Sequence, residues 1–281
     1  MASVVAVDGL TKTFKTLRAV DGISFAVERG ERLAYIGPNG AGKSTSIKML
    51  TGILYPTSGT ATVLGLTPWR ERRPLTRRIG TLFGQRSQLW SELTPRQSYR
   101  MLAAIVDLDD ATLRDRLGDL GALLEADELF DQPVRTLSLG QRMRCELAAC
   151  LLHEPEILFL DEPTIGLDLL GKKVFRELLV RLNDERGTTI FLTSHDVADI
   201  EYVARRVVVI NHGSVIYDDS VATMRRTLLA TKLVDVSLGE SVPPWSLDGV
   251  TVTEQTASTL KLVVDTTRRP VRESKVAVGV G

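Results

Sequence analysis

The stretch ERLAYIGPNGAGKSTSIKMLTG, residues 31–52, decides the fold of this chain. Its first part is a short apolar run that predicts a strand, and the pattern from Ser44 predicts a helix closed by Gly52. Between them, residues 37–44 fit the pattern GxxxxGK followed by Ser or Thr. A glycine-rich loop between a strand and a helix lets backbone amides and the helix N-terminus surround phosphate groups. We therefore predict a binding site for a nucleoside triphosphate.

Each part of this phosphate loop has an expected task. Lys43 is expected to reach the β and γ phosphates, and Ser44 is expected to ligate Mg²⁺. A flexible glycine turn without a function is the alternative, but the strand before the loop and the helix after it argue against that interpretation. The residues predicted to bind the phosphates are Gly37, Pro38, Asn39, Gly40, Ala41, Gly42, Lys43, Ser44 and Thr45.

A second apolar run, Ile157 to Leu160, predicts a buried strand that ends in Asp161 and Glu162. Carboxylates at the end of a buried parallel strand face the crevice in which α/β folds bind ligands. Asp161 is expected to hold Mg²⁺, and Glu162 is expected to act as the general base on the attacking water. An apolar run that ends in Asp-Glu is common by itself. Together with the phosphate loop it indicates ATP as the cofactor, with Mg²⁺, and hydrolysis.

The periodicity along the chain predicts an α/β fold. Residues 2–36 alternate in the manner of antiparallel hairpins, and residues 93–152 have a helical period throughout. The apolar runs EILFLDE, TTIFLTS and RVVVIN alternate with helical segments, which is typical of a parallel sheet with crossover helices. We expect a P-loop NTPase core with a mainly parallel sheet, an N-terminal antiparallel β subdomain and a helical subdomain inserted at about residues 90–152.

The predicted ATPase domain covers residues 1–230. Beyond it the sequence changes to short amphipathic runs, LVDVSL, VTVTEQ and LKLVVD, which predict strands. Residues 231–281 are therefore expected to form a small β-rich C-terminal extension, whose role the sequence does not indicate.

Composition excludes several other classes of protein. Thirty-five basic residues balance thirty-five acidic ones, so no net charge attracts nucleic acid or an anionic membrane from a distance. Cys145 and Cys150 lie five residues apart in one predicted helix, where their side chains diverge too far for a disulfide, and this agrees with a reducing cytosol. No run of 18 apolar residues occurs, so the chain is expected neither to cross a membrane nor to be secreted.

A third motif, LSLGQ at residues 137–141, stands just upstream of EILFLDEPT. LSxGQ followed by the aspartate-glutamate strand resembles the signature of ABC-transporter ATPase subunits, and the match extends in order over roughly residues 5–225. The resemblance implies that Phe14 stacks on adenine and that Gln85 ligates Mg²⁺ and senses the attacking water. It also implies that Gly166, Leu167 and Asp168 form the D-loop and that His195 is the switch histidine near the γ phosphate.

Each of these residues by itself has an ordinary structural explanation. An aromatic residue such as Phe14 is most often part of a core, Gln85 is a polar residue at a strand end, and His195 is a histidine in a loop. Their common order and spacing favour the functional interpretation.

The signature also has a physical interpretation. Ser138 is expected to cap the N-terminus of the helix LGQRMRCELAACLL, so that its hydroxyl and the first-turn amides form an anion site. The resemblance implies that Ser138, Gly140 and Gln141 contact the γ phosphate of ATP held by an opposite subunit, so that two chains bury two nucleotides. Leu139 stands where the family usually has glycine, and its side chain crowds a close backbone approach.

The resemblance implies a motor subunit, peripheral on the cytoplasmic face of the cell membrane. Its expected partners are separate membrane-spanning permease subunits and a second ATPase subunit, either an identical copy or a homologue. The wording of the motifs is closest to single-domain ATPases of bacterial exporters, with import as the alternative direction. The segment FGQRSQLWSELTP lies where the family receives a coupling helix from the permease, and we expect Leu89 and Trp90 to floor an apolar groove for it. Trp90 as part of the core is the other interpretation.

Two further hypotheses belong to other classes of function. The first is a soluble ABC-type mechanoenzyme on nucleic acid or ribosomes, but such relatives usually carry two ATPase cores or a coiled coil, and neither is present in this sequence. The basic cluster at Arg70, Arg72, Arg73, Arg77 and Arg78 is expected to be a solvated face, so no nucleic-acid partner is predicted. The second is a nucleotide-binding regulator without turnover, which the presence of both Glu162 and His195 argues against.

Overall fold

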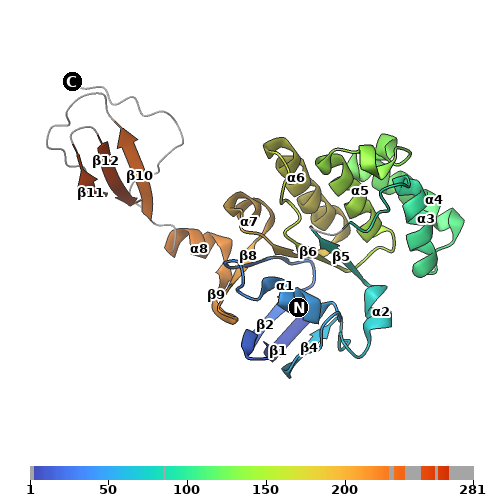
Figure 1. The fold of residues 1–281 in the computed structure, drawn as a ribbon, viewed down its shortest axis with the longest axis horizontal. Helices are drawn as coiled ribbons and strands as arrows, with labels where there is room; N and C mark the ends of the chain where they lie inside the picture. Colours follow the sequence, from blue (N-terminus) through green and yellow to red (C-terminus); the bar gives the residue numbers. More distant parts are fainter. Residues whose placement is uncertain (1–2, 85–86, 228–230, 238–247, 257–258, 266–281) are drawn as a thin grey trace. The chain divides into compact units, whose positions relative to one another are not determined.

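The computed structural model of this chain describes residues 3–84, 87–227, 231–237, 248–256 and 259–265 (Figure 1). The chain consists of two units, Met1–Asp219 and Ser220–Gly281. At the centre of the first unit is a six-stranded sheet with the order β5-β6-β7-β3-β8-β9. Its strands are β3 (Arg32–Ile36), β5 (Ile79–Phe83), β6 (Ile157–Asp161), β7 (Thr189–Thr193), β8 (Arg206–Asn211) and β9 (Ser214–Ser220).

The pairs β5-β6, β6-β7, β7-β3 and β3-β8 are all parallel, which confirms the predicted core. Parallel strands of one sheet need crossover connections, and α6 (Leu169–Arg186), between β6 and β7, and α7 (Val197–Val203), between β7 and β8, lie in two of them. Strands β8 and β9 are joined by His212 and Gly213, both in the left-handed conformation that a two-residue hairpin turn requires.

The antiparallel subdomain is a three-stranded sheet with the order β2-β1-β4. Its strands are β1 (Ser3–Phe14), β2 (Leu17–Glu28) and β4 (Ser58–Val63). The sequence prediction was wrong for the third apolar run of residues 2–36, because that run forms β3 in the parallel sheet. Residues 32–35 of β3 are all buried, so the alternation that marks a half-exposed hairpin strand is absent from them.

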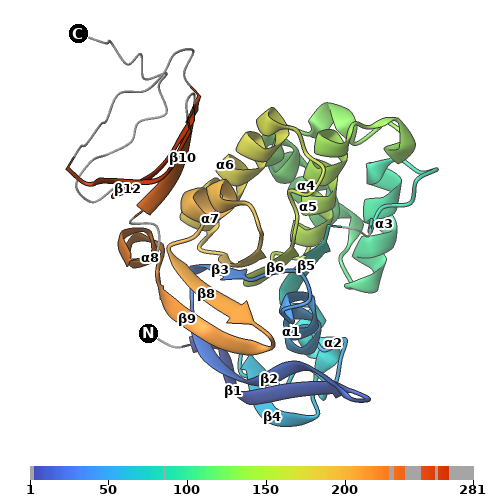
Figure 2. The same ribbon diagram turned by 60° about the vertical axis from the view of Figure 1, so that its left-hand side comes forward.

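Helix α1 (Lys43–Leu50) lies between the two sheets (Figures 1 and 2). Alternate residues of β6 show how the central sheet divides the interior. Ile157 and Phe159 pack into one core together with α1 and the antiparallel sheet, whereas Leu158 and Leu160 pack into a second core against the helices. Helix α1, which begins where the phosphate loop ends, is therefore packed on both sides.

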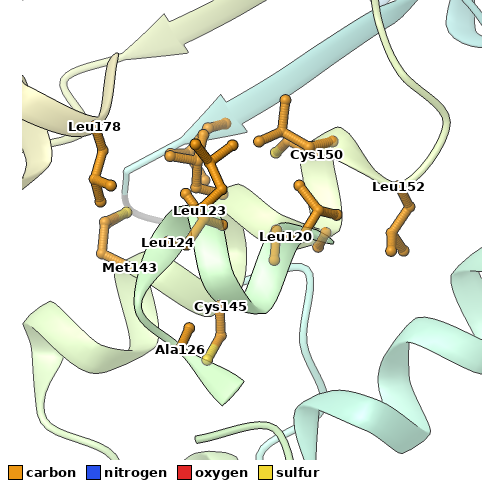
Figure 3. Close-up of a cluster of buried hydrophobic side chains, with 14 of the residues drawn as sticks. Leu120, Leu123, Leu124, Ala126, Met143, Cys145, Cys150, Leu152 and Leu178 are labelled. Atoms are coloured by element: carbon orange, nitrogen blue, oxygen red, sulfur yellow. The ribbon is translucent and has the colours of Figure 1, made fainter. Parts of the chain in front are cut away.

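The second core belongs to the predicted helical subdomain, where buried leucines, methionine and both cysteines pack together (Figure 3). Its helices are α3 (Pro95–Ile105), α4 (Asp110–Leu124) and α5 (Leu139–Leu151), with 3₁₀ turns at Asp127–Leu129 and Val134–Thr136, and the short helix α2 (Arg72–Thr76) precedes them in the chain. Thr94 and Ser138 form the capping boxes of α3 and α5, and Asp109 caps α4, so these three helices begin at residues suited to that position.

The second unit contains α8 (Val221–Thr227) and a three-stranded antiparallel sheet with the order β10-β12-β11. Its strands β10 (Thr231–Ser237), β11 (Val250–Gln255) and β12 (Thr259–Asp265) agree with the three predicted runs. Leu260, Leu262 and Val264 of β12 form its small apolar core. The unit boundary precedes α8, whereas the predicted domain boundary followed residue 230, and the division into functional domains stays a prediction. Among the described residues, no helix combines the length and the apolar character that a membrane span requires.

Candidate active site

The phosphate loop, residues 37–42, connects the end of β3 with the start of α1. Gly42 has φ 108°, and a Cβ atom at this position would lie 2.4 Å from the carbonyl oxygen of Ala19, so only glycine fits here. The amide of Gly213 donates a hydrogen bond to the carbonyl of Ala41 over 3.0 Å, which ties the loop to the β8–β9 turn. The loop is thus held in place while the first-turn amides of α1 have no acceptor within the helix.

Lys43 lies inside the site, and only 6% of its surface is exposed. Its Nζ donates to the carbonyl oxygens of Gly37 over 2.7 Å and Pro38 over 3.3 Å, and it lies 3.6 Å from Glu162 Oε1. A phosphate oxygen that enters the loop can therefore replace these oxygen atoms as the hydrogen-bond acceptor of the ammonium group.

Asp161 and Glu162 stand at the end of β6, as predicted, and the neighbouring strand β7 fixes both. Thr193 Oγ1 donates to Asp161 Oδ1 over 2.7 Å, and the amide of Glu162 donates to Thr193 O over 3.2 Å and to Thr193 Oγ1 over 3.0 Å. Glu162 has φ 53°, a left-handed conformation that is uncommon for a residue with a side chain. The chain turns sharply at this point and leaves the carboxylate at the edge of the sheet.

Glu162 joins two residues that the sequence places far apart. Its Oε1 faces Lys43, while its Oε2 accepts a hydrogen bond from His195 Nδ1 over 2.9 Å. The carboxylate is 16% exposed, whereas the imidazole is 62% exposed. A partly buried carboxylate with a positive charge on one side and a histidine on the other is an arrangement suited to proton transfer.

A pocket of about 540 Å³ connects these groups with Phe14. Phe14 is 42% exposed, and Lys12 Nζ lies 5.1 Å from the centre of its ring, so this ring lies at the surface and not in the core. The pocket is lined by Phe14, Leu17, Ala19, Pro38, Asn39, Gly40, Ala41, Gly42, Lys43, Ser44, Thr45, Glu162, Ile165 and His195.

The signature residues lie outside this pocket. Ser138 caps α5 as predicted, since its Oγ accepts from the amide of Gln141 over 3.2 Å while Gln141 Oε1 accepts from the amide of Ser138 over 2.8 Å. Ser138, Gly140 and Gln141 line a second pocket of about 430 Å³ together with Asp168, and this pocket shares no lining residue with the first. Asp168 caps α6 by accepting from the amide of Gly171 over 2.7 Å.

Leu139 packs within its own subunit. Its side chain contacts the helical core and lies over the D-loop, because a Cβ atom at Gly166 would be 2.9 Å from Leu139 Cδ2. Gly140 by contrast has open space around it. The crowding expected from Leu139 therefore falls on the D-loop of the same chain.

Three other predictions concern the segment after β5. Gln85 lies outside the described residues, so its assigned roles stay predictions. Leu89 is buried in the helical core, while Trp90 is 41% exposed, and the groove predicted over these two residues stays a prediction. The groove that the structure does show beside Gln88 has a volume of about 370 Å³ and is lined by Ile53, Leu102, Ile105 and Val106 and by Arg72, Arg73 and Arg77.

The exposure of the basic cluster agrees with the solvated face that the sequence predicts, since Arg70, Arg72, Arg73 and Arg77 are exposed and Arg78 is half-buried. Arg78 Nε donates to Glu156 Oε1 over 2.7 Å, and this contact lowers the pKa of the Glu156 carboxyl. Arg77 pairs with Asp107, and Arg72 and Arg73 border the groove. Three of the exposed arginines thus form part of the wall of a groove, while the ion pair of Arg78 joins the residue before β5 to the residue before β6.

The donor set beside the phosphate loop determines what kind of metal fits. Within the described ranges, no group of three or more His, Cys, Asp or Glu side chains could hold a metal ion by itself. A hydroxyl from Ser44 and a carboxylate from Asp161 are hard oxygen ligands of the type Mg²⁺ uses when substrate phosphates complete its coordination. The residues present thus fit magnesium bound together with a nucleotide, and they fit a resident structural metal poorly.

Sequence reasoning missed the residues beneath the site. Thr193 holds the main chain of Glu162, and Thr164, Ser194 and Asp199 form a buried hydrogen-bonded group between the strands. Threonine and serine at strand ends carry no pattern of their own, and the partners of Thr193 and Thr164 lie 31 and 35 residues away along the chain. Only the pairing of β6 with β7 brings them together.

A phosphate loop between a central strand and a helix, with two carboxylates at the end of a nearby parallel strand, defines a P-loop nucleoside triphosphatase. Residues 20–165 match the family described as ABC transporter, and the chain is 32% identical over 203 residues to the ABC transporter ATP-binding protein NatA of Bacillus subtilis (strain 168), covering 72% of this chain and 82% of NatA. The chain belongs to the ABC transporter family and is an ATP-binding ATPase of that family.

Another relative matches along more of the chain. The daunorubicin resistance ATP-binding protein DrrA3 of Streptomyces coeruleorubidus is 34% identical over 255 residues, which cover 89% of this chain and 80% of DrrA3. This match is longer than the first unit and therefore reaches into the second. Among solved structures, cbiO1 from Clostridium perfringens, part of the ABC transporter complex cbiONQ, superposes with a TM-score of 0.72 and 29% identity over 82% of this chain and 97% of that chain.

Proposed function

We propose that this chain is the motor subunit of an exporter, which hydrolyses ATP with Mg²⁺ and drives separate membrane-spanning permease subunits from the cytoplasmic face of the cell membrane. The observation that carries the enzymatic part is the position of Glu162, which contacts both Lys43 and His195 inside a pocket bordered by Phe14. The residues for adenine, phosphate and water are thus available in one place.

The chemistry assigns one task to each residue. Phe14 would stack on the adenine, and the loop amides and Lys43 would hold the β and γ phosphates. Mg²⁺, held by Ser44, Asp161 and Gln85, would supply positive charge to the phosphoryl group when bound. Glu162 would take the proton from the attacking water, while His195 would orient the carboxylate and contact the γ phosphate.

The separation of the two pockets supports a dimer. The signature residues Ser138, Gly140 and Gln141 do not line the pocket of their own phosphate loop. A nucleotide can touch both sets only if a second ATPase subunit, identical or homologous, supplies one of them. The exposed side chains of Leu169 and Leu170, next to the signature pocket, agree with a covered surface in such a dimer.

The groove lined by Ile53, Leu102 and Ile105 supports a docking site for the permease. It opens beside Gln88, within the segment in which we predict contact with a coupling helix. Apolar floors bordered by charged residues are suited to an amphipathic helix. The groove beside Gln88 is therefore the docking site that we propose.

The direction of transport can be tested with the complete complex. The chain, carrying an affinity tag, is isolated with its permease from native membranes in detergent and reconstituted into proteoliposomes. External ATP reaches only those complexes whose ATPase faces outward. Export then moves a substrate away from the ATP side, so that it accumulates in the lumen.

Daunorubicin is the first probe, because the name of the DrrA3 relative connects that protein with resistance to it. ATP-dependent uptake into the vesicles, absent from a Glu162→Gln complex, supports export. ATP-dependent release of preloaded substrate from the lumen would instead indicate import. Failure of any membrane protein to copurify with the chain would contradict the motor function itself.

A further inference from the structure

Asp199 is a carboxylate that is completely buried under the active site, in the first turn of α7. Its Oδ2 accepts hydrogen bonds from Thr164 Oγ1 over 2.5 Å and from Ser194 Oγ over 2.8 Å. Its Oδ1 accepts from Arg176 Nε over 2.5 Å. A buried carboxylate without partners is strongly unfavourable, so a side chain with one cationic donor and two hydroxyl donors is well stabilised in this position.

The three donors come from the segments that carry the reacting residues. Thr164 follows Glu162 by two positions, and Ser194 directly precedes His195. Arg176 belongs to α6, which begins after the D-loop residue Asp168. One carboxylate thus connects the base segment, the switch segment and the helix that follows the D-loop.

The switch segment has a second connection of the same kind. Asp196 Oδ2 accepts from Lys172 Nζ over 2.7 Å and from Arg176 over 3.4 Å, and the contact with Lys172 lowers the pKa of Asp196. Arg176 therefore contacts two carboxylates, Asp196 and Asp199, that both follow His195 within four residues of the chain. The imidazole of His195 is mostly exposed, so it is the main chain on both sides of it that these buried contacts fix.

We infer that Asp199 is a positioning residue for ATP hydrolysis, which holds the Glu162 and His195 segments in the register that gives their 2.9 Å contact and joins both segments to α6. This inference rests on the proposed functions of Glu162 and His195. Loss of the carboxylate allows the hydroxyl groups of Thr164 and Ser194 to reorient. It also removes one of the hydrogen-bond acceptors of Arg176. The hydrogen bonds of Asp199 in the described part of the chain go to Thr164, Ser194 and Arg176 and not to the phosphate loop, so we expect ATP binding to be preserved while the reacting geometry is lost.

The first experiment measures kcat and KM for ATP with the full chain carrying Asp199→Asn. The amide has the same shape but brings a donor to a place where Arg176, Thr164 and Ser194 already donate. We expect kcat to fall at least tenfold while KM changes less than about threefold, since the lost interaction acts on the transition state. Glu177→Gln, an exposed carboxylate of α6 that pairs with Lys173 over 3.9 Å, is the control and leaves both constants unchanged.

A matched pair at Thr164 separates positioning from folding. Thr164→Val keeps the shape and removes the donor, whereas Thr164→Ser keeps the hydroxyl and removes only a methyl group. We expect kcat to fall in the valine variant and to return close to the original value in the serine variant, at similar melting temperatures. Equal kcat values in the two variants would overturn the inference even if Asp199→Asn fails to fold.

A double-mutant cycle with His195→Ala completes the test. If Asp199 acts through His195, the double variant has nearly the same kcat as His195→Ala alone, because the imidazole that Asp199 positions is already absent. Multiplication of the two losses would contradict the inference. If Glu162→Gln and His195→Ala both leave kcat unchanged, the proposed function of the site fails first. If they lower kcat and Asp199→Asn does not, only the positioning role fails.

Discussion

Glu162 combines an unfavourable backbone conformation with the most consequential contacts of the site. A left-handed conformation at a residue with a side chain costs about 1–3 kcal/mol. Here it is imposed by the bonds from the Glu162 amide to Thr193, and it delivers the carboxylate to a point between Lys43 and His195. Strain at this position is therefore connected with the placement of the base.

Lys43→Ala is expected to weaken ATP binding by about a hundredfold or more. A charge-assisted hydrogen bond contributes about 1.5–3 kcal/mol, and Lys43 would make more than one such contact with the β and γ phosphates. Titration calorimetry with ATP measures the loss. Lys48→Ala, on the same helix but exposed, is the control and leaves the affinity unchanged. Retained micromolar affinity in Lys43→Ala would refute the assignment of the loop.

The two cysteines are expected to be inert in the folded protein. Burial raises the pKa of Cys145 to about 11 and that of Cys150 to about 12, so almost no thiolate exists at neutral pH. Thiol titration with an aromatic disulfide reagent should detect less than one reactive group in buffer and two after denaturation. Rapid labelling in buffer would show that the helical subdomain opens readily.

At the scale of elements, α5 carries the signature residues at its capped N-terminus. Its N-cap Ser138 and its first residue Leu139 lie beside the D-loop, and its core face carries both cysteines. Near its middle, Glu146 is buried and accepts from the amide of Gln88 over 2.9 Å and from the hydroxyl of Ser87. The helix is thus attached near its middle to the segment that follows β5 and lies at its start beside Gly166.

Leu139→Gly is expected to lower stability by about 1–2 kcal/mol, because a partly buried side chain and a good helix former are lost. The rate of ATP hydrolysis should be preserved or should rise, since the backbone at the signature becomes easier to approach. Thermal unfolding and steady-state hydrolysis measure the two effects separately. A large loss of hydrolysis would show that the contact of Leu139 with the D-loop at Gly166 is needed for activity.

The elements that were predictable are those whose pattern depends on short-range information. Strand β6, strand β7 and the cap at Ser138 follow from apolar runs and a capping residue. The assignment of β3 failed, because an edge of a hairpin and the centre of a parallel sheet differ only in what packs on the second face. The positions of Asp199 and Thr193 were equally out of reach, since their roles arise from strand pairing and not from spacing.

At the scale of the whole molecule, the groove beside Gln88 provides a surface on which to test partner binding. Ile105→Asp places a charge on the apolar lining, at a residue that is 71% exposed, so folding should be unaffected. We expect much less permease to copurify, with unchanged hydrolysis by the isolated chain. Met101→Asp, exposed on the same helix but outside the groove, is the control. Equal losses in both variants would contradict docking in this groove.

Glu162→Gln with ATP and Mg²⁺ is expected to convert the chain into a stable dimer. The amide keeps the shape of the carboxylate and removes the base, so ATP persists in the site. Each trapped nucleotide would join Lys43 and Ser44 of one chain to Ser138 and Gly140 of the other. Two such contacts reinforce each other as bivalent interactions do. Gel filtration with light scattering should give a dimer with ATP and a monomer with ADP, which lacks the γ phosphate.

Ser138→Arg, added to Glu162→Gln, distinguishes this dimer from other association. The arginine fills the signature pocket, which is separate from the phosphate pocket of the same chain, so ATP binding survives while the second chain loses its contact. We expect the double variant to stay monomeric with ATP. A dimer that persists in the double variant would contradict the pairing of the signature with the opposite nucleotide. A Glu162→Gln chain that stays monomeric is next measured in the complex with its permease, and absence of ATP-dependent closure there too would refute the role of the signature site.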